Sequence, residues 1–180
     1  MSSDRPIPNS YTVAPGQLYA GEYPGASAHT PTHDLTARLA SFLDAGITVF
    51  IDLTEALELD DYITPLSALA ESRGIAVVHE RHPIRDFSTT NPDAMRLTLD
   101  AIDAHHAAGR AVYVHCWGGV GRTGMTIGCW LVRHGHTPAE ALARVSEGFD
   151  SMQKRARMRN RTSPESADQI RVVEEWQSGA

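Results

Sequence analysis

The chain has 180 residues, the size of one domain, and its 42% hydrophobic and 21% charged residues are ordinary values for a globular protein with a core. Sixteen Lys and Arg against 22 Asp and Glu give a formal net charge of −6, which argues against general affinity for nucleic acid or an anionic membrane. With only two cysteines, Cys116 and Cys129, the sequence excludes a disulfide scaffold and a zinc site of clustered cysteines.

Residues 1–15 carry three prolines and no apolar run of the kind found in a secretory signal, so we expect a flexible N-terminal arm there. A single domain is expected over residues 16–180. Apolar periodicity, helix caps and glycine stops predict its elements. In chain order these are an edge strand over 17–20, a helix over 34–45, a strand over 47–53, a helix from Pro65 to Gly74, a strand over 75–79, a helix over 92–109, a strand over 111–115, and helices over 123–133, 138–147 and 164–176.

The predicted strands alternate with helices and read as nearly continuous apolar runs. That pattern is typical of an α/β fold with a central, mostly parallel sheet flanked by helices. Sheets of this kind place their functional sites at the carboxyl ends of the strands.

A glycine-rich segment, HCWGGVGRTG over residues 115–124, follows the strand 111–115. Its glycines allow the backbone to curl so that successive N–H groups point inward, and the next helix adds its positive end. The planar guanidinium of Arg122 binds two phosphate oxygens at once. The segment therefore predicts a phosphate cradle. Its expected substrate-binding residues are Trp117, Gly118, Gly119, Val120, Gly121 and Arg122.

Cys116 stands at the foot of this predicted cradle. The amides, helix end and Arg122 that favour a phosphate also favour a thiolate, placed for in-line attack on phosphorus. We expect the Thr123 hydroxyl to donate to the sulfur and help it leave in a second step, and His115 to orient the loop. The alternative is a tight strand-to-helix turn with a core cysteine, which does not require an arginine.

HCWGGVGRTG resembles the signature loop of the cysteine-based protein tyrosine phosphatase superfamily, and the short chain is similar to the atypical dual-specificity phosphatases and their bacterial relatives. Three further segments resemble that family: VFIDLTEALEL its upstream strand and turn, HPIRDFS its general-acid loop, and SPESADQ the start of its last helix. The resemblance covers about residues 17–177 and implies a dual-specificity phosphatase-like fold.

Within HPIRDFS, the resemblance makes Asp86 the general acid that protonates the leaving group and then, as carboxylate, activates water. Two alternatives stay open: Asp86 as a surface residue paired with Arg85, or Asp93 as the acid, although Asp93 also suits a helix start for dipole reasons alone. Gln169 stands where relatives often carry a Gln implicated in placing the hydrolytic water. A solvated helical Gln is the other interpretation.

The nine histidines do not form a pattern typical of a metal site, so we expect no metal and no cofactor. His105 and His106 are adjacent on a helix and point in different directions, whereas His134 and His136 lie at a helix end, where imidazole suits the dipole.

Three other features have two interpretations each. The run KRARMRNR over residues 154–161 is either a solvated face or a basic rim that steers an anionic substrate. Thr54 and Glu55 either shape substrate choice or belong to a solvated loop. Cys129 is expected in the core, too far along its helix to pair with Cys116.

The residues predict a phosphomonoesterase that acts through a cysteinyl-phosphate on Cys116, and the resemblance implies that its substrates are phosphotyrosine, and also phosphoserine and phosphothreonine, in proteins. We expect a cytoplasmic monomer without nucleic-acid or membrane partners. One alternative substrate class is an inositol phosphate, a phospholipid or an RNA 5′-phosphate, although the loop has none of the lysines that lipid-directed members tend to carry. The chain could instead be a phosphate-binding pseudoenzyme, or a thiol redox enzyme or arsenate reductase, which would need a second thiol near Cys116.

Overall fold

The computed structural model describes residues 5–26, 34–153 and 160–179. Its five-stranded sheet has the order β1-β2-β5-β3-β4, in which β1 runs antiparallel to β2 and every other pair is parallel. The strands are β1 (Ser10–Ala14), β2 (Leu18–Gly21), β3 (Ile47–Asp52), β4 (Val78–Arg81) and β5 (Ala111–His115). The helices are α1 (Leu35–Asp44), α2 (Ile63–Ser72), α3 (Pro92–Ala107), α4 (Gly121–Arg133), α5 (Pro138–Asp150) and α6 (Ala167–Glu175).

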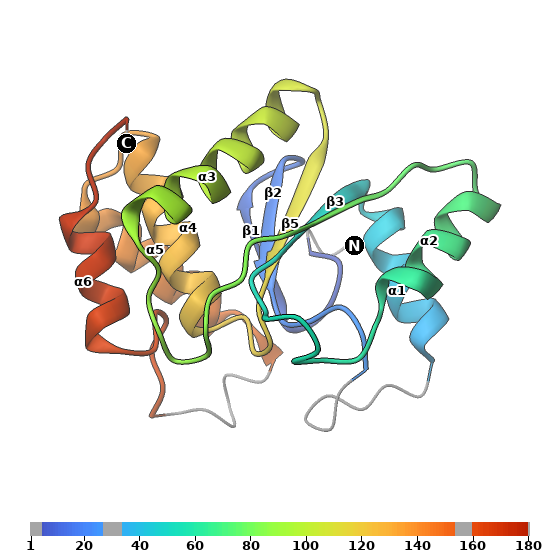
Figure 1. Ribbon diagram of the computed structural model, residues 1–180, viewed down its shortest axis with the longest axis horizontal. Helices are drawn as coiled ribbons and strands as arrows, with labels where there is room; N and C mark the ends of the chain where they lie inside the picture. The colour runs from blue at the N-terminus through green and yellow to red at the C-terminus, as the bar shows by residue number, and fades with distance from the viewer. Residues whose placement is uncertain (1–4, 27–33, 154–159, 180) are drawn as a thin grey trace.

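The sheet lies between two layers of helices, α1 and α2 on one face and α3 to α6 on the other (Figure 1). The central strand β5 is buried along its whole length, and its side chains alternate between the layers. Val112 and Val114 pack into the larger apolar core under α3 to α6, whereas Tyr113 packs into the smaller core under α1 and α2. The predicted α/β fold with a mostly parallel sheet is confirmed.

The expected arm over residues 1–15 is wrong for its described part. Residues 10–14 form β1, which pairs with β2 from Ser10↔Gly21 onward, and Ile7, Tyr11 and Val13 are buried. The prolines and polar residues of this segment are typical of a flexible arm, but these three apolar side chains pack into the cores and fix the segment to the rest of the chain. As a result the strand predicted over 17–20 is not an edge strand, because β1 takes the edge and β2 lies inside the sheet.

Two predicted helix caps are present in the structure, and several helices begin at other residues than predicted. The side chains of Asn91 and Thr137 cap α3 and α5 as expected. The predicted start of the last helix at Pro164 is wrong, because α6 begins after the cap residue Ser166. The Ser166 side chain accepts a hydrogen bond from the backbone N–H of Gln169. Helix α4 begins at Gly121, two residues earlier than predicted, so Arg122 lies in its first turn.

Three loops meet at the carboxyl edge of the parallel strands, at the bottom of Figure 1. They are the β3–α2 loop (residues 53–62), the β4–α3 loop (residues 82–91) and the β5–α4 loop (residues 116–120). The candidate site lies at this edge, as the parallel sheet predicts. Among the described residues, no helix is both long enough and apolar enough to cross a membrane.

Candidate active site

Cys116 ends the central strand and begins the loop that leads into α4. Its side chain is buried, at 3% exposure. In the described structure no side chain caps the first turn of α4, whose N-cap is Val120. Uncapped amides at a helix start, together with the helix dipole, make a site for an anion. Cys116 and the start of α4 are thus placed on either side of a short loop, as the sequence predicts for a phosphate cradle.

The β5–α4 loop is packed tightly against the edge of β2. Gly119 has a φ of +68°, and a Cβ there would lie 2.2 Å from the carbonyl carbon of Gly21. Only glycine meets both conditions. The amide of Tyr23 donates to the Trp117 carbonyl at 3.0 Å, and the Ser163 hydroxyl donates to the Val120 carbonyl at 2.7 Å. Both neighbours therefore fix the backbone of the loop.

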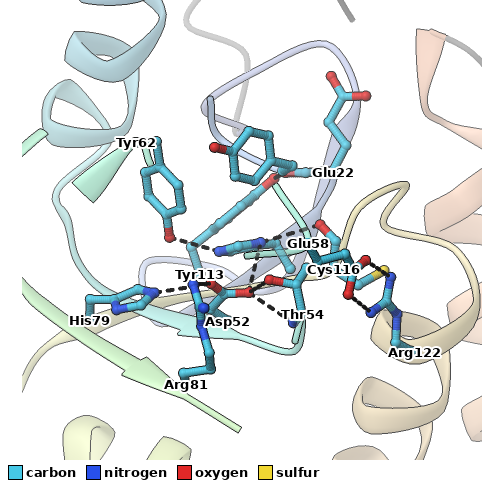
Figure 2. A network of polar contacts seen from close by, with 12 residues as sticks. Glu22, Asp52, Thr54, Glu58, Tyr62, His79, Arg81, Tyr113, Cys116 and Arg122 are labelled. Carbon is cyan, nitrogen blue, oxygen red and sulfur yellow. Dashed lines mark hydrogen bonds and ion pairs between the residues drawn. The ribbon is translucent and has the colours of Figure 1, made fainter. Parts of the chain in front are cut away.

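Arg122 lies next to Cys116, and both terminal nitrogens of its guanidinium have partners (Figure 2). Nη1 donates to Glu58 Oε2 at 2.8 Å and to the Ile84 carbonyl at 3.1 Å. Nη2 donates to Glu58 Oε1 at 2.6 Å and pairs with Asp86 Oδ1 at 2.9 Å. With 1% of its surface exposed, this cation is held rigidly by acceptors from both of the other loops.

Glu58 is the site residue that sequence reasoning missed. Burial alone would raise the pKa of its carboxyl, but hydrogen bonds from Arg122 and from the Glu55 amide outweigh burial and hold this pKa below its usual value. The β3–α2 loop offers two glutamates three residues apart, Glu55 and Glu58, and the sequence singled out the exposed one. Only the folded path of the loop decides which carboxylate reaches Arg122.

The structure brings Asp86, and not Asp93, to Arg122. Asp86 has a side chain that is 42% exposed and forms its ion pair with Arg122 rather than with its neighbour Arg85. Asp93 lies in the first turn of α3, pairs with Arg96 at 2.7 Å and is 93% exposed. The structure thus brings a partly exposed carboxylate against Arg122, which in turn lies beside Cys116.

His115, the last residue of β5, connects Cys116 to Tyr62 at the end of the β3–α2 loop. Its Nδ1 lies 3.3 Å from the Cys116 carbonyl and its Nε2 lies 2.7 Å from the Tyr62 hydroxyl. Because a carbonyl only accepts, Nδ1 carries the proton and Nε2 accepts from Tyr62. Burial lowers the pKa of His115 to about 4, so the ring is neutral. His115 thus orients the loop, as predicted.

Asp52 is the buried anion of this network. Its carboxylate accepts from the Thr54 hydroxyl at 2.6 Å, from His79 at 3.1 Å and from Arg81 at 2.8 Å. Burial alone would raise its pKa, but hydrogen bonds from His79 and Thr54 outweigh burial, so its pKa lies well below the usual value. Thr54 therefore supports the end of β3 and does not line a substrate rim.

The Thr123 hydroxyl is buried and has no hydrogen-bond partner among the described residues. The predicted bond from Thr123 to the Cys116 sulfur is therefore absent from this structure. Gln169 is fully buried and not solvated. Its amide lies against Gly121, where a Cβ would be 2.9 Å from Gln169 Oε1, and its Nε2 donates to the Ser88 carbonyl at 3.1 Å.

The remaining predicted features lie away from this cluster. Cys129 is buried in the larger core, and burial raises the pKa of its thiol to about 12. Residues 154–159 of the basic run lie outside the described residues, and Arg161 pairs with Glu165 at 2.9 Å. Across residues 5–26, 34–153 and 160–179, no three His, Cys, Asp or Glu side chains gather in a way suited to a metal ion.

Comparison with known proteins gives the family of the chain and agrees with its fold. A family model described as the DSP-PTPase phosphatase of polymorphic toxin systems matches residues 24–136. The structure of Tk-PTP in its active form is 22% identical, with 94% of this chain and 97% of that chain covered and a TM-score of 0.67. PTPMT1 in complex with PI(5)P is 17% identical, with coverages of 93% and 94% and a TM-score of 0.66. TpbA of P. aeruginosa in complex with pTyr is 17% identical, with coverages of 96% and 92% and a TM-score of 0.57.

Proposed function

The chain belongs to the DSP-PTPase phosphatase family of polymorphic toxin systems, and on that premise we propose that it hydrolyses phosphotyrosine, and also phosphoserine and phosphothreonine, in proteins through a cysteinyl-phosphate on Cys116. One observation carries the proposal: a buried cysteine and a buried arginine from the segment that joins β5 to α4 meet a partly exposed aspartate from the β4–α3 loop at one sheet edge. A simple strand-to-helix turn would not require the aspartate to meet the arginine.

In the first step the Cys116 thiolate attacks phosphorus, a sulfur–phosphorus bond forms, and the bond from phosphorus to the ester oxygen breaks. Asp86 gives its proton to the departing oxygen. Arg122 and the amides of residues 117–122 stabilise the equatorial phosphoryl oxygens. Because Asp86 occupies Nη2 of Arg122 in the ligand-free chain, the incoming phosphate must displace it, which frees Asp86 to face the leaving group.

In the second step water attacks phosphorus, the sulfur–phosphorus bond breaks, and inorganic phosphate and the Cys116 thiolate are released. The Asp86 carboxylate takes a proton from the attacking water, which restores the acid for the next cycle. We expect Thr123, whose buried hydroxyl has no partner among the described residues, to donate to the departing sulfur in this step. No step of this sequence calls on a metal or a cofactor.

Two exposed apolar side chains support a protein substrate. Leu57 is 98% exposed and Phe87 is 61% exposed, and each directly adjoins a carboxylate that binds Arg122. An apolar rim suits the ring of a phosphotyrosine better than an inositol phosphate or a nucleic-acid end. The five residues between Cys116 and Arg122 include no lysine that would pair with extra phosphates of a phosphoinositide.

The mechanism is tested by hydrolysis of p-nitrophenyl phosphate in the presence of EDTA. We expect turnover by the wild type, a loss of at least about a thousandfold in Cys116→Ser, and a loss of about a hundredfold or more in Asp86→Asn with phenyl phosphate, whose poorer leaving group needs the acid. Binding of phosphate by an inactive wild type would replace the proposal with a phosphate-binding pseudoenzyme. Dependence of turnover on Cys129 would favour thiol redox chemistry.

The substrate class is tested by comparing kcat/KM on a phosphotyrosyl peptide, a phosphoseryl peptide, a phosphoinositide and an RNA 5′-phosphate. We expect the phosphotyrosyl peptide to lead, and Leu57→Ser or Phe87→Ser to weaken that preference. Leu97→Ser is the matched control, because Leu97 is 65% exposed on α3 and adjoins no site residue. A preference for the phosphoinositide or the RNA end would contradict the protein assignment.

A further inference from the structure

The side chain of Gln169 connects three segments of the site, and each of its amide atoms is already in use. Nε2 donates to the Ser88 carbonyl at 3.1 Å. Oε1 accepts from the amides of Glu165 at 3.1 Å and Ser166 at 3.3 Å. The residue is completely buried. An amide committed to protein partners in this way has little capacity left for a solvent molecule.

The bond to Ser88 acts on the segment that carries Asp86. The Ser88 amide donates to the Arg85 carbonyl at 3.0 Å, which closes a tight turn with Asp86 as its second residue. The third residue of the turn, Phe87, has a φ of +57° although it is not glycine. A turn with such a residue carries backbone strain and needs outside support to persist.

The two ends of this turn are fixed from opposite sides. Before the turn, the Ile84 amide donates to the Leu53 carbonyl at 3.0 Å and the Ile84 carbonyl accepts from Arg122 at 3.1 Å. After the turn, among the described residues, the Ser88 carbonyl is held by Gln169. In Figure 1 the β4–α3 loop passes the beginning of α6, where Gln169 lies. Gln169 therefore supplies the second of the two attachments that hold Asp86 over the site.

We propose that Gln169 is a positioning residue for the general acid Asp86, acting through Ser88, and not the residue that holds the hydrolytic water. This inference rests on the proposed function of the site. A positioning residue for the acid affects the step in which the ester bond breaks. A residue that places the water affects only the breakdown of the cysteinyl-phosphate.

Steady-state kinetics separate these two steps. The value of kcat/KM reports events up to loss of the alcohol or phenol, and its dependence on the leaving group measures proton donation. Loss of acid positioning lowers kcat/KM for phenyl phosphate more than for p-nitrophenyl phosphate, whose anion leaves without help. Loss of water placement leaves kcat/KM unchanged for both esters, lowers kcat and produces a burst of p-nitrophenol.

The variant of choice is Gln169→Glu. Its carboxylate still accepts from the Glu165 and Ser166 amides, so the start of α6 stays capped, but it no longer donates to Ser88. Gln169→Met, which removes all three contacts, is the second variant. Glu140→Met is the matched control, because Glu140 has the same capping role at the start of α5, where its side chain accepts from the Thr137 amide at 2.8 Å. Thermal unfolding of each variant verifies that it is folded.

We expect Gln169→Glu to lower kcat/KM for phenyl phosphate about tenfold or more, with less than a threefold change for p-nitrophenyl phosphate. In an Asp86→Asn background the same substitution should add little, because the two residues act as a unit. Glu140→Met should leave the ratio of the two esters unchanged.

Equal losses for both esters, or an unchanged kcat/KM with a burst, would overturn the proposal for Gln169 while leaving the cysteinyl-phosphate mechanism intact. Full activity in Cys116→Ser would instead overturn the proposed function itself, and with it any role of Gln169 in proton donation. The two failures are therefore distinguished by the Cys116 variant measured in the same assay.

Discussion

Arg122 is a buried cation whose two terminal nitrogens are both bound by oxygens from loops that precede it in the chain. A buried guanidinium without such partners would be strongly destabilising, and the carboxylate of Glu58 offsets that desolvation. The bidentate contact also sets the plane of the guanidinium before any phosphate arrives. Pre-set donors stabilise a transition state better than mobile ones.

The first prediction at this scale concerns Glu58. Replacing Glu58 with Gln keeps the shape of the side chain and removes the charge that fixes Arg122, so kcat/KM for p-nitrophenyl phosphate should fall about tenfold, which corresponds to about 1.4 kcal/mol. Glu55→Gln changes an exposed glutamate in the same loop and should have less than a twofold effect. Equal losses in the two variants would mean that Glu58 contributes only general negative charge.

The second residue-scale prediction concerns the two thiols. Burial raises the pKa of Cys129 to about 12, so almost none of it is thiolate at neutral pH. Iodoacetate at pH 7.5 should therefore modify the folded chain at Cys116, with loss of activity, and should reach Cys129 only in denaturant. Peptide mass mapping after partial inactivation makes the measurement. Carboxymethyl-Cys129 in active, folded protein would count against this assignment.

At the scale of elements, the site depends on the close approach of the β5–α4 loop to the end of β2. Gly119 combines a left-handed φ of +68° with a backbone neighbour where its Cβ would lie, whereas a Cβ at Gly118 would lie 3.5 Å from the Val120 side chain, an ordinary contact. Two adjacent glycines of the same motif thus have different roles. The sequence marks both as part of the cradle and does not separate them.

This pair makes a matched test. Gly119→Ala should lower the free energy of unfolding by about 2 kcal/mol or more, because the loop must move away from β2, and phosphate binding should weaken with it. Gly118→Ala should change the free energy of unfolding by less than about 0.5 kcal/mol. Urea unfolding of both variants provides the comparison. Similar values for the two would argue against the close contact between the loop and β2.

Element-level prediction succeeded where a local signal decides the outcome. Asn91 before Pro92 and Thr137 before Pro138 identify two helix starts, and β-branched runs identify β3 and β5. It failed where tertiary contacts decide. Whether residues 10–14 form an arm or an edge strand depends on α5 and β2 packing against Tyr11 and Val13, which no local pattern encodes.

At the scale of the whole molecule, the buried network around His115 joins the two cores to the reactive loop. Tyr62 is the N-cap residue of α2 on one side of the sheet, Asp52 ends β3, and the Cys116 carbonyl belongs to the loop. This neutral histidine is completely buried, so its protonation is coupled to unfolding of the chain.

The pH dependence of stability follows from His115. Its pKa is about 4 in the folded chain and 6.5 in an unperturbed side chain, because burial disfavours the charged ring. Between these two values the unfolded state binds a proton that the folded state does not. The free energy of unfolding should therefore fall as pH decreases from about 6.5 toward 4, by up to about 3 kcal/mol from this residue.

Urea unfolding of the wild type and of His115→Asn across this range isolates that contribution from those of the other histidines. The difference in the free energy of unfolding between the two proteins should change with pH as expected for the uptake of one proton on unfolding. Parallel curves for the two proteins would mean that His115 is charged, or exposed, in the folded state.

The residues of the site that could be predicted from the sequence lie in short contiguous motifs. Cys116 and Arg122 share a short motif with their phosphate-binding glycines, and HPIRDFS contains Asp86. Glu58 and the engaged amide of Gln169 lie far away in sequence and reach the site only because the parallel strands and α6 bring their loops together. Their roles depend on side-chain partners that no spacing rule specifies.

The central claim is that phosphate passes through Cys116. Rapid mixing with saturating p-nitrophenyl phosphate, an acid quench within the first turnover and peptide mass mapping test this claim directly. We expect one added phosphoryl group on the peptide that contains Cys116, and none in Cys116→Ser, which should also release no p-nitrophenol. A phosphoryl group on a different residue, or turnover that continues in Cys116→Ser, would show that phosphate does not pass through Cys116.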